Sequence, residues 1–289
     1  MSHWHGLARV CEAGSPPKNE DLCHIGDDLA FVLDGATGLG PSRLTDQPSD
    51  ASWFVGRLAD HLRHVWCETH RVEKALRIAL ARVAEAWHAR VPDNLPVEQL
   101  PSAAMVLAAR EGDELVMLRL GDCELYLATK HGVERVFGDS PLQTLDRRAI
   151  DAVMDLRQRG HSLEDALTAV RPMLVSHRTL MNTPGGYSAL SVAHQEQIRP
   201  DIKRVEAEGV CRMLLASDGF AAAWQAYDLG TPDALLGSRD AQEALEALLR
   251  RLRKLEWQDA DGDRFPRLKC HDDATALLLE AQASALRSG

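Results

Sequence analysis

Residues 29–35 read Leu-Ala-Phe-Val-Leu-Asp-Gly, a short apolar run that ends in a carboxylate and a glycine. A run of aliphatic and aromatic residues of this length predicts a buried strand. Residues 213–219, Met-Leu-Leu-Ala-Ser-Asp-Gly, repeat the pattern. An aspartate also follows the largely apolar residues 115–121, and another precedes the apolar residues 274–279. The chain therefore places acidic residues at the ends of several predicted strands.

These carboxylates are Asp34, Asp122, Asp218 and Asp272. A carboxylate at the end of a strand is held by the rigid sheet while it faces solvent at the rim. Several such oxygens brought together would suit Mg²⁺ or Mn²⁺, which prefer oxygen ligands. Taken singly, each Asp-Gly pair is also explained as a turn, and Asp122 could close a hairpin. The joint pattern favours a metal-dependent hydrolase.

Composition narrows the class of protein. The chain has 289 residues and a formal net charge of −10, which argues against a nucleic-acid partner because a phosphate backbone would be repelled. No stretch approaches the roughly 20 apolar residues of a spanning helix, and the first residues lack a signal-peptide core. The six cysteines include no Cys-x-x-Cys pair, which is typical of reduced thiols. We expect a cytoplasmic protein without a membrane partner.

Periodicity predicts strands in antiparallel clusters separated by pairs of helices, which is an α+β pattern. Helical spacing covers residues 54–66 and 72–87. Three strands follow, Ala103–Ala109, Glu114–Leu120 and Cys123–Thr129, and turns at 111–113 and 121–122 predict an antiparallel meander. The later elements are helices near 149–159, 162–175 and 240–255 and strands near 201–207, 212–217 and 274–280. Two sheets packed face to face with helices outside would accommodate these elements.

Five short motifs resemble, in order, those of the metal-dependent protein phosphatases of the PPM/PP2C type. They are Asn19-Glu20-Asp21, Val32-Leu33-Asp34-Gly35-Ala36-Thr37-Gly38, Leu120-Gly121-Asp122-Cys123, Leu215-Ala216-Ser217-Asp218-Gly219 and Asp272-Asp273-Ala274-Thr275. The resemblance runs from residue 19 to residue 275. It implies a single phosphatase domain over residues 1–289 that folds as a four-layer α-β-β-α sandwich. We expect residues 139–197 to form an accessory, flap-like insertion.

The resemblance also implies a centre of two Mn²⁺ or Mg²⁺ ions, with a third ion near Asp122. Asp34 would bridge the two ions, and the carbonyl of Gly35 would bind one of them. Asp218 and Asp272 would hold the first ion. Two cations lower the pKa of a bridging water and so supply hydroxide for attack on phosphorus.

Two further residues have roles that the resemblance implies. Glu20 would bind the second ion, directly or through water, and Asp21 would orient the metal-bound water. The implied activity is hydrolysis of phosphoserine or phosphothreonine in a phosphorylated protein substrate.

The sequence departs from the family pattern at three points. Pro16 stands where many members have an arginine that binds the substrate phosphate, and Lys18 or Arg43 could substitute in part. Ala36 stands where many members have a histidine proposed as a general acid. No later aspartate is evident as a partner for Asp122 at a third metal site.

These departures keep two alternatives open. One is a pseudophosphatase, a binding module of the same fold that turns over little. The other is a hydrolase of small-molecule phosphoesters.

Overall fold

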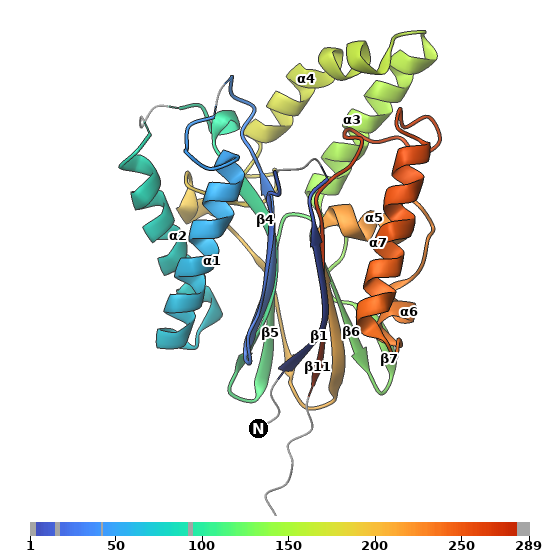
Figure 1. Ribbon diagram of the computed structural model, residues 1–289. Helices are drawn as coiled ribbons and strands as arrows, with labels where there is room; N and C mark the ends of the chain where they lie inside the picture. The colour runs from blue at the N-terminus through green and yellow to red at the C-terminus, as the bar shows by residue number, and fades with distance from the viewer. Residues whose placement is uncertain (1–3, 15–17, 42, 92–94, 282–289) are drawn as a thin grey trace, which may run out of the picture.

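In the computed structural model, which describes residues 4–14, 18–41, 43–91 and 95–281, two antiparallel sheets pack face to face between two layers of helices (Figure 1). This confirms the expected α+β class and the α-β-β-α sandwich. Over the same residues no helix is both long and apolar enough to cross a bilayer.

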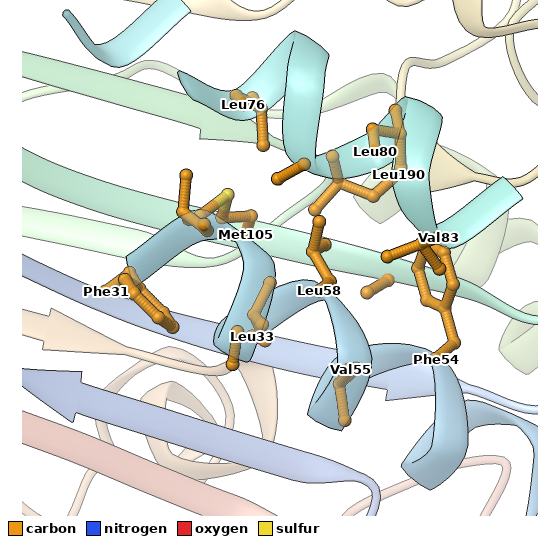
Figure 2. Packing of buried hydrophobic residues seen from close by; sticks show 14 of the residues in the cluster. Phe31, Leu33, Phe54, Val55, Leu58, Leu76, Leu80, Val83, Met105 and Leu190 are labelled. Carbon is orange, nitrogen blue, oxygen red and sulfur yellow. The ribbon is translucent and has the colours of Figure 1, made fainter. Parts of the chain in front are cut away.

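The first sheet has the strand order β2-β3-β4-β5-β9, and β8 pairs with β4. Its strands are β2 (Asp21–Ile25), β3 (Leu29–Ala36), β4 (Ser102–Glu111), β5 (Glu114–Leu120), β8 (Leu190–Ser191) and β9 (Asp201–Glu206). Helices α1 (Asp50–Thr69) and α2 (Val72–His88) cover its outer face. Figure 2 shows Leu58 of α1 and Leu80 of α2 in the same apolar cluster as the sheet residues Phe31, Met105 and Leu190.

The second sheet has the strand order β1-β11-β10-β6-β7. Its strands are β1 (Trp4–Glu12), β6 (Glu124–Thr129), β7 (Gly132–Arg135), β10 (Val210–Ala216) and β11 (Ala274–Ala281). Helices α5 (Asp218–Gln225), α6 (Pro232–Leu236) and α7 (Ala241–Gln258) cover its outer face. Short 3-10 turns lie at Val97–Gln99 and Gln195–Gln197.

The period-two alternation of β3 fixes where its carboxylate points. Phe31 and Leu33 pack against the α1–α2 layer, whereas Ala30 and Val32 pack between the sheets. Because successive side chains of a strand face opposite sides, Asp34 continues the inner series. It therefore stands at the end of the space between the two sheets.

Helices α3 (Pro141–Gln158) and α4 (Leu163–Thr179) rise beyond the sheets, and α4 leans back toward the α1–α2 side (Figure 1). Ser140 begins α3 with a capping box to Gln143, and Pro141 occupies the first helical position. Ser162 caps α4. The two helices pack on each other through Val153, Ala166 and Val170.

The predicted meander is wrong in its third strand. β4 and β5 pair as expected, but β6 pairs with β10 and β7 in the other sheet. Gly121 makes this crossover at φ 76°, and a Cβ on it would lie 2.5 Å from the Cβ of Ala104. Periodicity identifies a strand, but it does not identify the strand's partner.

The turn readings of the two Asp-Gly pairs are also wrong. Asp34 and Gly35 lie inside β3, opposite Ala104 and Ala103 of β4. Asp218 is the first residue of α5. Both pairs are therefore built into regular elements at one end of the sandwich.

Candidate active site

A cavity of about 820 Å³ opens at the end of the sandwich where β3, β5 and β10 finish. Helix α3 borders it, and Arg178 near the end of α4 lies on its wall. Six aspartates lie on the wall. One, Asp139, pairs with Arg135, and the other five, called the acidic cluster below, are Asp34, Asp122, Asp146, Asp218 and Asp272. Four of these aspartates are the strand-end residues predicted from the sequence, and the structure brings them together.

Asp34 and Asp218 lie at the centre of the acidic cluster. Burial raises the pKa of Asp34, and the charge of Asp218 raises it further. Burial and the charge of Asp272 likewise raise the pKa of Asp218. Both shifts have the same physical origin, because two carboxylates lie close together in a buried site.

Asp272 has a cationic partner of its own. The Lys269 Nζ donates to both of its carboxylate oxygens, at 2.8 and 2.9 Å. The Lys269 side chain is 62% exposed, and the carboxylates around its ammonium, Asp272 first, raise its pKa. Lys269 therefore supplies positive charge at the edge of the acidic cluster.

Asp122, in the crossover between β5 and β6, and Asp146, on α3, complete the acidic cluster. Burial raises the pKa of Asp122, followed by the charge of Asp218. Burial also raises the pKa of Asp146 to about 7, again with a contribution from Asp218. The charge of Asp146 also raises the pKa of Asp122, so Asp146 is an aspartate neighbour of Asp122 that was not evident from the sequence.

Glu20 and Asp21 lie outside the residues that form the cavity wall. Glu20 accepts hydrogen bonds from Thr37 and, at 2.8 Å, from Lys18. Lys18 is therefore engaged with this carboxylate, and Glu20 would bind a cation only by exchanging these partners. Asp21 pairs with Asp34 in the β2–β3 register and is buried, and neither of its carboxylate oxygens has a hydrogen-bond partner among the described residues.

Two glycines allow the backbone to close around the cluster. A Cβ on Gly35 would lie 2.5 Å from the carbonyl oxygen of Glu20. A Cβ on Gly219 would lie 2.0 Å from the carbonyl oxygen of Asp273. The carboxylate of Asp273 in turn accepts backbone N–H groups from Gly14 (2.8 Å) and Glu20 (2.6 Å). Asp273 thus ties the start of β11 to the loop that precedes β2.

The donor set fits hard divalent cations in its chemistry. Every member of the acidic cluster offers carboxylate oxygens, and burial together with mutual repulsion raises the pKa values of Asp34, Asp122 and Asp218. Among the described residues, however, no three His, Cys, Asp or Glu side chains already stand in the arrangement of a metal site. Binding a cation at Asp272 would require the Lys269–Asp272 ion pair to be exchanged for a contact with the ion.

Sequence reasoning missed Asp146, Lys269 and Arg178. The first turns of α3 are polar, so apolar spacing placed the helix start near residue 149; the Ser140–Gln143 capping box was the available signal. Lys269 precedes Asp272 by three residues, a spacing that could have suggested the ion pair. Pro16 lies outside the described residues, and Ala36 lies on the cavity wall as an alanine.

Comparison with known proteins gives a result at the level of structure. No protein-family model and no curated protein matches the chain. Solved structures do match. The catalytic domain of the serine threonine protein phosphatase PstP, in complex with two manganese ions, is 15% identical with a TM-score of 0.61, covering 98% of this chain and 100% of that one.

Two further structures agree with this match. The PPM Ser-Thr phosphatase MsPP from Mycobacterium smegmatis, in complex with cacodylate, is 17% identical with a TM-score of 0.56, over 96% of this chain and 97% of that one. PppA, a regulatory component of T6SS in Pseudomonas aeruginosa, is 20% identical with a TM-score of 0.55, over 98% and 99%. At these identities the likeness concerns the fold, and this chain has the fold of the PPM-type serine/threonine phosphatases.

Proposed function

We propose that this protein is a Mn²⁺- or Mg²⁺-dependent phosphatase that hydrolyses phosphoserine or phosphothreonine in phosphorylated proteins. The observation that carries the proposal is the convergence of Asp34, Asp122, Asp218 and Asp272 on one cavity. The presence of two manganese ions in the similar PstP domain supports the cofactor.

In this proposal each residue has a defined task. Asp34, Asp218 and Asp272, with the carbonyl of Gly35, would hold the cations, and Asp122 would contribute to a third site. Bound there, such cations would supply Lewis acidity for activating water and for neutralising charge on the phosphoryl oxygens. Asp21, buried beside Asp34 in the β2–β3 pair, is assigned the orientation of that water. Because Ala36 cannot donate a proton, protonation of the leaving oxygen falls to water or to another residue.

The domain assignment belongs to the same proposal. Residues 1–289 form one phosphatase domain, in which residues 139–197 are an accessory element that shapes the substrate side of the cavity. Asp146, Arg178 and Tyr187 of this segment lie on the wall. A phosphorylated protein is the proposed partner, because the open cavity suits it. The cytoplasm is the proposed location. The acidic wall disfavours nucleic acid.

The test measures hydrolysis of p-nitrophenyl phosphate with added Mn²⁺ and with EDTA. Activity should require the metal, and Asp34→Asn should lower kcat by at least about a hundredfold because the central charge of the cluster is lost. Asp151→Asn, an exposed residue of α3, is the matched control and should retain kcat. Activity that survives chelation, or near-normal turnover in Asp34→Asn, would contradict the proposal.

A pseudophosphatase is the second candidate, and the Lys269–Asp272 ion pair favours it because the ammonium competes with a cation for Asp272. That reading predicts that the protein binds Mn²⁺ but does not turn over substrate. If turnover is present, a panel of phosphopeptides and small phosphoesters separates a protein phosphatase from a small-molecule phosphoesterase.

A further inference from the structure

The cavity wall carries cations as well as carboxylates, and their partners differ. They are Arg135, Arg147, Arg178, Arg264, Arg267 and Lys269. Three of these are engaged by carboxylates: Arg135 by Glu124, Arg267 by Asp259 and Lys269 by Asp272. Arg147 and Arg264 are exposed. Arg178 belongs to neither group.

The guanidinium of Arg178 is held by backbone atoms. Its Nη2 donates to the carbonyl oxygen of Ala36 at 2.8 Å, with a longer contact of 3.4 Å to that of Leu100. Among the described residues no carboxylate forms an ion pair with it. These bonds hold the guanidinium on the wall that also carries the acidic cluster, and the carboxylate whose charge acts on it is that of Glu20.

Part of this guanidinium lacks an acceptor. The Nε–H of Arg178 is buried and has no hydrogen-bond partner among the described residues. Leaving a buried donor of a charged group unsatisfied costs free energy, and such groups in a cavity wall call for an explanation. The phenol of Tyr187, also on the wall, lies beside the guanidinium and offers no negative charge at neutral pH.

We propose that Arg178 is the substrate-binding residue that takes the phosphoryl oxygens of the substrate and of the inorganic phosphate product. An arginine presents a planar fork that binds a phosphoryl group through two N–H donors, which an ammonium does not reproduce. A phosphate dianion entering an acidic cavity also needs positive charge that no carboxylate has neutralised. This inference rests on the proposed function and adds that α4, an element of the accessory segment, supplies the phosphate contact.

The test uses Arg178→Gln, Arg178→Lys and the control Arg171→Gln in the full chain with saturating Mn²⁺. Arg171 lies on the same helix and donates to the carbonyl oxygen of Leu39 at 3.0 Å, but it is not on the cavity wall. Arg178→Gln should raise the KM for p-nitrophenyl phosphate and the inhibition constant of inorganic phosphate by about tenfold or more. Both constants of Arg178→Lys should lie between those of Arg178→Gln and those of the wild type. Arg171→Gln should change neither constant.

A purely structural role for Arg178 would give a different pattern. Arg178→Gln would then lower the melting temperature while the inhibition constant of phosphate stayed within twofold of the wild type, and this result would overturn the inference. If Arg178→Gln does not fold, Arg178→Lys decides, because it keeps the charge and loses the planar fork. Equal phosphate inhibition in Arg178→Lys and the wild type would reject the fork as the binding group.

Calorimetric titration of the Mn²⁺-loaded protein with inorganic phosphate separates this inference from the proposed function. A wild type that binds phosphate without turnover, and loses that binding in Arg178→Gln, supports the role of Arg178 while the proposed activity fails. A wild type that turns over, with phosphate binding unchanged in Arg178→Gln, leaves the activity and overturns the role of Arg178. A wild type that binds no phosphate contradicts the inference directly.

Discussion

At the scale of single residues, the acidic cluster places like charges close together. Asp34, Asp122, Asp146 and Asp218 all have raised pKa values, with burial as the first cause in each case. Such carboxylates destabilise the metal-free fold whenever they are ionised. The cluster thus stores unfavourable free energy that a bound cation would relieve.

Asp146 provides a pH-dependent test of this repulsion. Its pKa is raised to about 7, so the folded metal-free protein holds the proton more tightly than the unfolded chain does. Stability should therefore fall as pH rises from the ordinary aspartate pKa toward about 7. In EDTA, the melting temperature of Asp146→Asn relative to wild type should be higher at about pH 8 than at about pH 5.

Asp151→Asn serves as the control for this pH series, because Asp151 lies on the exposed side of the same helix. Its difference from the wild type should vary less with pH than that of Asp146→Asn. A difference for Asp146→Asn that is equally flat would remove Asp146 from the set of mutually repelling carboxylates.

Single residues also show what could be predicted. Asp34, Asp122, Asp218 and Asp272 were identified because each stands beside an apolar strand, a signal local to the sequence. Asp146 and Arg178 have no such signal: they reach the cavity from α3 and α4, and only the tertiary path of those helices places them there. The sequence therefore predicts the part of the site built on strands and misses the part supplied by the accessory helices.

At the scale of elements, the crossover from β5 to β6 connects the two sheets and carries Asp122. Gly121 adopts φ 76°, donates its N–H to the carbonyl oxygen of Ser188 at 2.8 Å, and sits against Ala104. A strand pattern at 123–129 predicted the strand correctly, yet its partner depends on this crossover. The sequence offered only a Gly-Asp pair, which also suits a hairpin.

Gly121→Ala tests the crossover. The substitution forces an alanine into a left-handed backbone and against Ala104, so it should destabilise the protein by about 1–3 kcal/mol. The control is Gly112→Ala, since Gly112 also has a positive φ of 71° but meets nothing within 4 Å. Chemical denaturation of both should show the larger loss for Gly121→Ala, and equal losses would show that the contact with Ala104 contributes nothing.

The accessory helices suggest a separable role in substrate choice. Replacing Ser162–Val175 of the α4 region by a short linker leaves Asp146 and Arg178 in the chain, and it removes none of Asp34, Asp122, Asp218 or Asp272. We expect a changed preference across a phosphopeptide panel, with Mn²⁺ affinity within a few fold of the wild type. Loss of metal binding in a variant that remains folded would place this segment in the metal centre itself.

At the scale of the whole molecule, three apolar cores hold the four layers together. One lies under α1 and α2, one between the sheets and one under α5–α7. The α+β class followed from periodicity, and the layer order followed from resemblance to a known family. The packed layers hold one end each of β3, β5, β10 and β11 at the same rim of the sandwich. Residues from distant parts of the sequence therefore meet there without a large motion.

The central claim is that this rim binds divalent cations, and thermal melting of wild type and Asp218→Asn in EDTA and in Mn²⁺ tests it most directly. Mn²⁺ at a hundred times its dissociation constant should stabilise the wild type by about 2.7 kcal/mol. Asp218→Asn should melt at or above the wild type in EDTA, because one repelling charge is gone, and should gain less from Mn²⁺. An equal Mn²⁺-induced shift in the two proteins, or no shift in the wild type, would contradict the account.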